Sequence, residues 1–232
     1  MGLYIILMGV QGAGKGVQAN FISQTYDIPH VSTGDLFRAM KTREDDLAQK
    51  VQQIMASGAL IDDETTNAIV ADRLAQDDAQ SGVILDGYPR NTVQAEFLAQ
   101  YLAERDESVT GVLYLDLDLY VAFKRAFGRV TASDGASYNY YYKPDAVSFT
   151  VEKHPDDAYP PRLVASKDGE TLKRRSDDAD AMAVIKRIDT YLDNTMPLLQ
   201  YYEDKGLLHK IDADQTIDAV SDEIQTVIEQ LS

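Results

Sequence analysis

Apolar residues in this chain of 232 residues fall into short runs, separated by segments with helical spacing. The strand-like runs cover residues 3–8, 82–85, 112–115 and 207–211. Strands that alternate with helices are typical of an α/β domain, in which helical crossovers join parallel strands. We therefore predict four strands of a parallel sheet at these runs, with helices between them.

Side chains that cap or stop helices mark several helix boundaries. Residues 16–26 carry Val17, Phe21 and Ile22 on one apolar face, and Pro29 stands shortly after this segment as a stop signal. Oxygen-bearing side chains precede three further helical segments, and we expect them to act as caps: residues 32–35 before a helix from 36, residues 62–63 before 64–79, and Asp118 before 119–128.

A long helix with one apolar side is predicted for residues 178–202. We expect Asp177 and Asp178 to cap this helix and to act as a hinge for the segment before it, residues 130–173. Pro197 lies inside the segment and has no N–H to donate, so it should kink or break the helix.

Residues 130–173 differ in composition from the flanking segments and are rich in turn-forming residues. Four of the five residues from 138 to 142 are tyrosines, which could form a small packed cluster. We interpret this region as a flap of short strands inserted into the core, because helical segments flank it on both sides.

The first strand leads into the sequence GVQGAGKG at residues 9–16. Glycines let such a loop fold tightly, so that backbone N–H groups and the positive end of the next helix point at phosphate oxygens. Lys15 adds a positive charge for the β- and γ-phosphates. The spacing matches a P-loop through Lys15, but Gly16 replaces the hydroxyl residue that usually reaches Mg²⁺. The loop predicts a polyphosphate site.

The sequence LDGYPR at residues 85–90 places an acid at the end of the second predicted strand. Ligands of open parallel sheets bind at the carboxyl ends of the strands. We expect no direct protein ligand to Mg²⁺; Asp86 would orient the ion through water, and Arg90 would contact a transferring phosphoryl group.

Composition excludes several kinds of partner and site. The net charge of −16 disfavours nucleic acid and anionic membranes, which attract clustered Lys and Arg. The absence of cysteine excludes disulfides and a thiolate zinc site, and it fits a reducing compartment. No apolar run approaches the roughly 20 residues of a membrane span, and the start of the chain lacks a signal-peptide pattern. We expect a cytoplasmic protein without nucleic-acid or membrane partners.

Five segments together resemble the motifs of adenylate kinases, in the order and spacing of that family: GVQGAGKGVQA, VSTGDLFR, LDGYPRNTVQA, RRSDD and TYLDNTMPLLQYY. The resemblance runs from Leu3 to about Val227. It implies a single P-loop kinase core over residues 1–232, with a parallel sheet flanked by helices, an inserted AMP-binding helical domain at 32–61 and an inserted lid at 130–175. It also implies a monomer that reversibly transfers the γ-phosphoryl group of ATP to AMP, with Mg²⁺, to give two ADP.

The resemblance assigns the glycine loop and the lid side to ATP. Arg125 and Arg129 would lie four residues apart on one helix face and contact the ATP base and phosphates. The residues implied for ATP are Gly12, Ala13, Gly14, Lys15, Gly16, Val17, Arg125, Arg129, Ser137, Tyr138 and Gln215.

A second set would bind AMP, with Gln94 reading the adenine edge through its amide. The residues implied for AMP are Thr33, Arg38, Ala59, Leu60, Ile61, Gly87, Tyr88, Pro89, Arg90, Gln94, Arg175 and Arg187. Those implied for catalysis are Lys15, Asp86, Arg90, Arg129, Arg175 and Arg187, with lid closure excluding water. Arg174 adjoins Arg175, and the sequence leaves open which of the two contacts the transferred group.

Many members of the family hold the lid with four cysteines on zinc, and others use a polar network. This chain has no cysteine, so we expect no zinc site in the lid. We expect a polar network instead, for which Thr131, Ser133 and Asp134 are candidates. The tyrosine cluster is expected to form the core of the lid.

Two other functions are compatible with these motifs. A UMP/CMP-type kinase would be expected to carry Ala at the position of Thr33 and a short lid, so Thr33 and the long lid favour AMP. A non-catalytic or weakly active adenine nucleotide sensor is supported by Val17, which stands where the family usually has Thr; the lost hydroxyl could weaken binding by about 1 kcal/mol. Gln11 also departs from the usual Pro.

Overall fold

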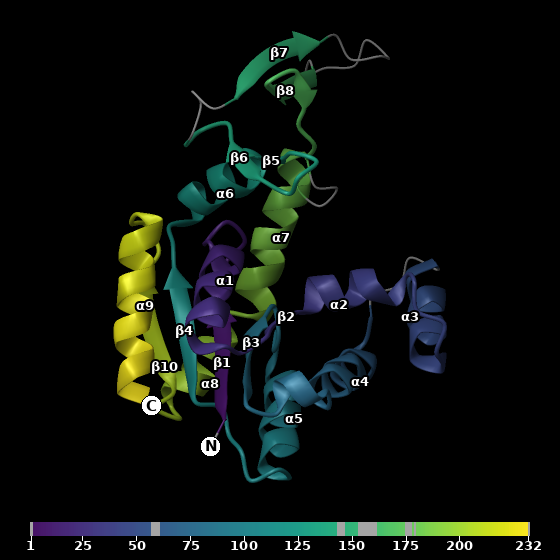
Figure 1. The fold of residues 1–232 in the computed structure, drawn as a ribbon, viewed down its shortest axis with the longest axis vertical. Helices are drawn as coiled ribbons and strands as arrows, with labels where there is room; N and C mark the ends of the chain where they lie inside the picture. The colour runs from purple at the N-terminus through teal and green to yellow at the C-terminus, as the bar shows by residue number, and fades with distance from the viewer. Residues whose placement is uncertain are drawn as a thin grey trace. The chain divides into compact units, whose positions relative to one another are not determined.

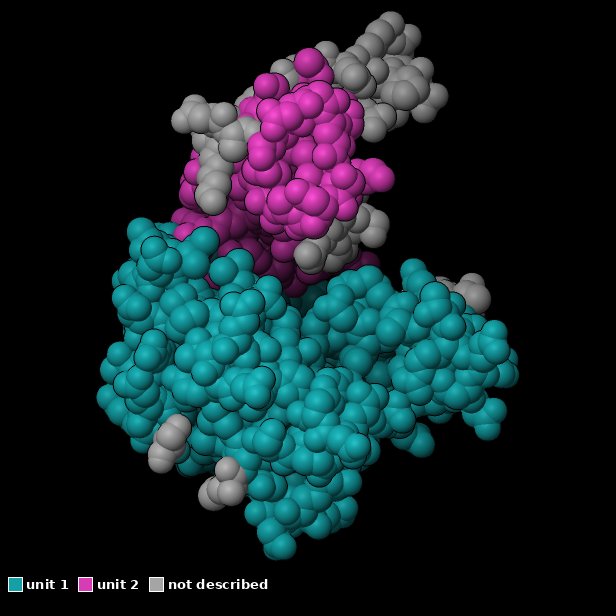
Figure 2. Space-filling view, in the orientation of Figure 1, with its two compact units in different colours: residues 1–9, 14–117, 190–232 teal, residues 10–13, 118–189 magenta. Residues whose placement is uncertain are grey.

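The computed structural model describes residues 2–56, 61–142, 147–152, 162–174, 178 and 180–231. The chain forms two compact units, which Figure 2 colours separately. The first contains Met1–Gly9, Gly14–Leu117 and Thr190–Ser232, and the second contains Val10–Ala13 and Asp118–Asp189.

A five-stranded sheet with the strand order β10-β4-β1-β3-β2 forms the centre of the first unit (Figure 1). All its strands are parallel. β1 (Leu3–Met8), β3 (Gly82–Asp86), β4 (Gly111–Asp116) and β10 (Leu208–Asp212) confirm the four predicted strands. β2 (His30–Ser32) was not predicted, since three residues are too short for a periodic pattern. The α/β fold with a parallel sheet flanked by helices is confirmed.

Helices bury the sheet by contributing apolar side chains to its core. α4 (Asp63–Leu74), α5 (Thr92–Ala103) and α8 (Pro197–Glu203) share one cluster with the strands, to which they bring Val70, Leu98 and Leu198. Burying a side chain of this size stabilises a fold by about 1.5–3 kcal/mol. The cluster therefore holds these three helices against the sheet.

α1 (Lys15–Tyr26) packs against α9 (Ile217–Leu231) in the same unit. The prediction that Val17 lies on the buried face of α1 is wrong, because its side chain is 48% exposed. Gln18 is buried instead, donates to the carbonyl of Ile217 at 3.2 Å and accepts from the Ser221 hydroxyl at 3.0 Å. Two hydrogen bonds thus satisfy a polar side chain at the helix interface.

A smaller core joins α2 (Thr33–Met40), α3 (Asp46–Ala56) and α4. It contains Met40, Val51 and Ile69, with Ile61 packed against it. The predicted cap of α4 is confirmed, since the Asp62 carboxylate accepts from the backbone N–H of Thr65 at 2.6 Å. The helix ends at Leu74, and a short 3-10 turn, η1 (Asp77–Ala79), follows it. The boundaries 32–61 of a separate AMP-binding domain stay a prediction.

The second unit contains α6 (Leu119–Phe127), the antiparallel pair β5 (Arg129–Thr131) and β6 (Ser137–Asn139), and the antiparallel strands β7 (Ser148–Glu152), β8 (Arg162–Lys167) and β9 (Glu170–Thr171). Its apolar cluster consists of Val130, Val147, Ala165 and Leu172, against which Tyr138 and Tyr140 pack.

The structure confirms part of the predicted tyrosine cluster and shows hydrogen bonds at two of the candidates for the polar network. Tyr141 and Tyr142 are 49% and 43% exposed, so only the other two tyrosines pack on the core. Among the polar candidates, the backbone N–H of Ser133 donates to Glu170 at 2.7 Å, and Asp134 accepts from the N–H of Ala136 at 2.8 Å. The first bond joins residues that are 37 apart in the sequence, and the second closes a local turn. The lid boundaries 130–175 stay a prediction.

Two expectations about helix ends are corrected. Arg129 does not share a helix face with Arg125, because α6 ends at Phe127 and Arg129 opens β5. Gly128 permits the change of direction: a Cβ there would lie 2.6 Å from Oδ1 of Asn139 on the returning strand. Asp178 does not cap the following helix, since Asp180 accepts from the N–H of Ala183 instead.

The predicted helix over 178–202 is two helices, α7 (Ala181–Asn194) and α8. Pro197 is the first residue of α8, where its missing N–H leaves no hydrogen bond unmade. The predicted break at this proline is confirmed.

Candidate functional site

The glycine loop joins β1 to α1 and presents Lys15 at the start of the helix. The ammonium group of Lys15 donates to the carbonyl of Gly9 at 2.7 Å. Gly14 precedes the helix with φ 94°, a left-handed conformation that favours glycine. Gly12 has φ 92°, and a Cβ on it would lie 2.6 Å from the carbonyl oxygen of Ala122. Both positions therefore need glycine.

Asp86 ends β3, and its side chain is 17% exposed. Burial by itself would raise the pKa of this carboxyl, but a contact with His30 and the charges of Lys15 and Arg90 together lower the pKa below its usual value. The atoms Nε2 of His30 and Oδ2 of Asp86 are 3.5 Å apart, the outer limit of a hydrogen bond. Asp86 is therefore ionised at neutral pH. Sequence reasoning missed His30, whose role depends on a strand too short to predict.

Thr33, Gly87 and Arg90 come together at the carboxyl ends of β2 and β3. The hydroxyl of Thr33 donates to the Gly87 carbonyl at 3.0 Å, and Nε of Arg90 donates to the same oxygen at 2.8 Å. Gly87 has φ 77°, and a Cβ there would lie 2.9 Å from the Thr33 hydroxyl. Tyr88 and Pro89 are buried, while Arg90 is exposed. The arrangement anchors a cation at the sheet edge.

The other residues implied for AMP occupy different surroundings. Gln94 is buried on α5, and Ile61 packs in the small core of α2 to α4. The Arg38 side chain is 62% exposed and pairs with Asp35 at 2.5 Å. Ala59 and Leu60 lie outside the described residues.

Arg129 and Arg187 meet at one carboxylate in the second unit. Asp178 is fully buried, and it accepts from Nε of Arg129 at 3.0 Å and from Nη1 of Arg187 at 2.6 Å. A second guanidinium nitrogen of Arg129 also donates to it. Sequence reasoning missed this role of Asp178, since the pairing joins residues from three separate segments.

The sequence leaves Arg174 and Arg175 as alternatives for contacting the transferred group. The guanidinium of Arg174 lies 4.4 Å from the ring centre of Phe127 and 5.0 Å from that of Tyr140. These are cation–π contacts within the second unit. Arg174 therefore has a packing role, while Arg175 lies outside the described residues.

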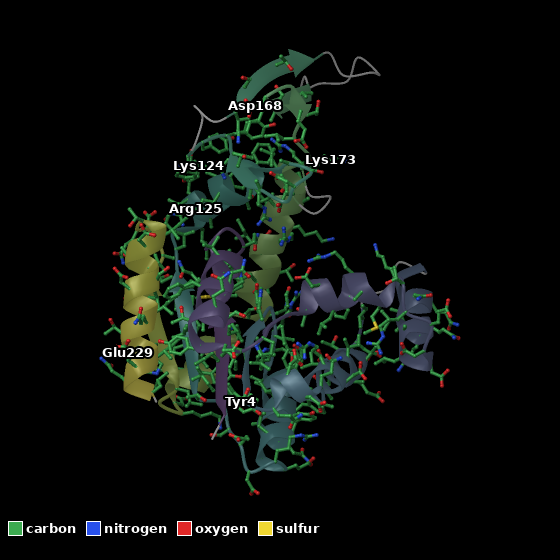
Figure 3. All side chains as sticks on the ribbon, in the orientation of Figure 1. Tyr4, Lys124, Arg125, Asp168, Lys173 and Glu229 are labelled. Atoms are coloured by element: carbon green, nitrogen blue, oxygen red, sulfur yellow. The ribbon has the colours of Figure 1, made fainter. Side chains whose placement is uncertain are left out.

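The remaining residues implied for ATP are at the surface of the first unit or in the second unit. Arg125, labelled on α6 in Figure 3, lies 5.6 Å from the ring centre of Tyr142. Tyr138 accepts from the ammonium group of Lys167 at 2.6 Å, and the exposed Ser137 pairs with Thr131 across the β5–β6 ladder. Gln215 is exposed in the loop after β10, where its amide donates to Glu223 at 3.0 Å.

Across the described segments, no group of three or more His, Asp or Glu side chains has an arrangement that could hold a metal ion. The helices within those segments are also too short or too polar to cross a membrane.

The sequence profile named adenylate kinase matches residues 7–207. An adenylate kinase from Caldanaerobacter subterraneus subsp. tengcongensis is 39% identical over 225 residues, which cover 97% of this chain and 95% of that relative. An adenylate kinase from Listeria monocytogenes is 37% identical over 97% of this chain and 98% of its own length, and one from Oceanobacillus iheyensis is 37% identical over 97% and 99%.

The chain belongs to the adenylate kinase family. It is therefore a nucleoside monophosphate kinase, a phosphotransferase, and the resemblance noted in its motifs is confirmed. The chain carries the glycine loop, the LDGYPR segment and the arginines of the family motifs. Its parallel α/β sheet is the fold that these motifs predict.

Proposed function

We propose that this adenylate kinase transfers the γ-phosphoryl group of ATP reversibly to AMP and forms two ADP. The observation that carries the assignment of residues is the electrostatic environment at the end of β3. The charges of Lys15 and Arg90 both act on the carboxylate of Asp86, beside the glycine loop. Two cations and an ionised acid at this edge are suited to a polyphosphate and its metal ion.

Phosphoryl transfer depends on placement of the two substrates and on neutralisation of charge, and it requires no covalent intermediate. We assign ATP phosphate binding to the loop from Gly12 to Val17, with Lys15 as its charge. Thr33 and Arg90 would hold the phosphate of AMP. Their shared bonds to the Gly87 carbonyl support this assignment, because they fix the Arg90 side chain.

Arg129 and Arg187 are proposed to stabilise the negative charge of the transferring group. Asp178 holds both guanidiniums through hydrogen bonds, so the two side chains are already ordered before the reaction begins. Guanidiniums are suited to phosphate oxygens, to which they can donate two parallel charged hydrogen bonds. Arg175 and Arg38 remain proposed phosphate contacts.

Mg²⁺ is proposed to accompany ATP. Magnesium usually keeps several waters and uses one or two carboxylates besides substrate phosphates. The single ionised carboxylate of Asp86, 17% exposed, fits that requirement through water. When bound, the ion would neutralise charge on the β- and γ-phosphates. The chain's own contribution is to keep Asp86 ionised through Lys15, Arg90 and His30.

We also propose that the enzyme is a cytoplasmic monomer with ATP, AMP and ADP as its ligands and no nucleic-acid or membrane partner. The net charge of −16 supports the absence of polyanionic partners. We further propose an AMP-binding helical domain at 32–61 and a lid at 130–175. The apolar cluster of Val130, Val147, Ala165 and Leu172 lies within 130–175 and supports the lid. Met40, Ala48 and Val51 support a helical unit at 32–61, and their core extends to Ile69 on α4.

A panel of phosphate acceptors tests the substrate assignment. The enzyme is assayed with ATP, Mg²⁺ and each of AMP, CMP, UMP and GMP, and kcat/KM is measured for each acceptor. We expect AMP to be preferred by about 100-fold or more, the range of discrimination that a hydrogen-bonding site achieves. A kcat/KM for CMP or UMP that equals or exceeds the value for AMP would contradict the assignment of AMP as the acceptor.

A further inference from the structure

Two partners of opposite polarity hold the side-chain amide of Gln94. Its oxygen Oε1 accepts from the backbone N–H of Arg90 at 2.8 Å, and its nitrogen Nε2 donates to Oδ1 of Asp63 at 2.6 Å. Gln94 is 5% exposed, so its side-chain amide has little access to water, while Asp63 is half-buried. Asp63 is not among the motif residues implied for either nucleotide.

These partners determine which way the amide faces. A backbone N–H can only donate, and an ionised carboxylate can only accept. If the amide were flipped, its NH₂ group would face the N–H of Arg90 and its oxygen would face the carboxylate of Asp63. Both buried contacts would then become repulsive, and unmade hydrogen bonds of buried groups are costly. The protein itself therefore fixes the orientation of the Gln94 amide before any base binds.

Asp63 is in turn held in place by its neighbours. Nδ2 of Asn91 donates to the same Oδ1 at 2.9 Å, and Oδ1 of Asn91 accepts from the backbone N–H of Gln94 at 2.9 Å. Asp63 is also the first residue of α4, where the helix dipole favours a negative charge. The start of α4 and the start of α5 are thus connected by a closed set of hydrogen bonds through Asp63.

The remaining hydrogen-bonding capacity of the amide matches adenine. The two contacts use one lone pair of Oε1 and one hydrogen of Nε2, and they leave one of each. Adenine offers a 6-amino donor beside the acceptor N1, which is the complementary pair. Hypoxanthine offers a 6-oxo acceptor beside N1–H, which is the reverse. An amide locked in this orientation can pair with the first base and not with the second.

We infer that Asp63 is a positioning residue that sets base selectivity at the acceptor site by locking the Gln94 amide. This inference rests on the proposed function, in which Gln94 contacts AMP. The matched comparison is between AMP and inosine monophosphate, which differ at these two ring positions and carry the same ribose phosphate.

The test measures kcat and KM for AMP, inosine monophosphate and ATP in the wild type and in Asp63→Ala. The variant is expected to raise KM for AMP about tenfold and to lower the ratio of kcat/KM for AMP to that for inosine monophosphate about tenfold, with kcat and KM for ATP unchanged. Asp63→Asn should restore the wild-type values, because its amide oxygen can accept both hydrogen bonds. Glu64→Ala is the control, since it removes an exposed acid from the same helical turn.

An unchanged selectivity ratio in Asp63→Ala would overturn the inference, as would an equal loss in Glu64→Ala. Asp63→Ser replaces Asp63→Ala if the latter does not fold: a serine is a small polar residue in the first turn, which leaves the cap at Asp62 in place, but it is one atom too short to hold the amide, and the same changes are expected. Failure of the proposed function would be visible separately, as absence of AMP turnover by the wild type.

Discussion

Nη1 of Arg187 donates a hydrogen bond to Oδ1 of Asp178 over 2.6 Å. The other oxygen of this fully buried carboxylate accepts from Arg129. Each arginine taken alone could be a surface charge that contributes little to stability. Their common partner instead fixes two guanidiniums in one place, which supports the proposed role of both in phosphoryl transfer.

Replacing Asp178 by Ala should remove the carboxylate that holds both guanidiniums. We expect kcat to fall about 10- to 100-fold and the free energy of unfolding to fall by about 1–3 kcal/mol, because charged hydrogen bonds of a buried group are lost. Steady-state kinetics and chemical denaturation measure the two effects. Asp189→Ala is the control, since Asp189 is an exposed acid on α7. Equal kinetics in the two variants would contradict the role of Asp178.

Replacing Val17 by Thr should strengthen ATP binding. The side chain is 48% exposed in the first turn of α1, so the nearly isosteric Thr fits without repacking. One added hydrogen bond to a phosphate is worth about 1 kcal/mol, which corresponds to a decrease of about fivefold in KM for ATP. KM for AMP should stay constant and serves as the internal control. An unchanged KM for ATP would show that this position does not contact the nucleotide.

The lid should depend on its apolar cluster and not on a metal. Leu172 is 5% exposed and packs with Val130 and Ala165. Leu172→Ala is expected to destabilise the region by about 2–4 kcal/mol, through lost burial and the cavity left behind. Hydrogen exchange of β5, β6 and β8 measures this loss. Lys173→Ala, which removes an exposed neighbouring side chain, should change little.

Zinc chelation gives a second test of the lid. The chain has no cysteine, so a chelator should leave hydrogen exchange in β5 to β9 unchanged. A chelator that accelerates exchange there would show that a metal ion stabilises the lid after all.

Stability should fall in alkaline solution as buried tyrosines ionise. Burial, together with a hydrogen bond to Asp116 at 3.0 Å, raises the pKa of Tyr114 to about 12. A tyrosine whose pKa is raised in the folded state stabilises the fold fully below its unfolded pKa of about 10, and this contribution is lost between about pH 10 and about pH 12. Melting temperatures measured across this range should fall less for Tyr114→Phe than for the wild type. Tyr120→Phe, at a position 68% exposed, should behave like the wild type.

Much of the sheet could be predicted from sequence because β1, β3 and β4 are largely continuous apolar runs, although β10 has His209 and Lys210 between its apolar residues. β2 could not be predicted, since it has three residues and depends on pairing with β3. Helical spacing predicts Val17 on the apolar face of α1, but Gln18 is buried instead. Its hydrogen-bond partners, Ser221 and the carbonyl of Ile217, belong to α9. Helical spacing alone does not reveal such partners.

The site residues divide in the same way. The motifs around Lys15 and Asp86 are contiguous in sequence and could be found there. The partner of Arg129 could not, since Gly128 ends the helix through a close approach of Asn139, and Asp178 joins segments far apart in the chain. Asp63 was expected only to cap α4, whereas its contact with Gln94 requires the packing of α4 on α5.

The most direct test of the account is phosphorus NMR of ATP, AMP and Mg²⁺ incubated with the wild type and with Lys15→Met. We predict that the wild type forms two ADP for each ATP consumed, without release of inorganic phosphate. Lys15→Met should still bind ATP but transfer the phosphoryl group at least about 100-fold more slowly, as expected when a group that stabilises transition-state charge is removed. Absence of ADP with the wild type, release of phosphate in its place, or a wild-type rate in Lys15→Met would contradict the account.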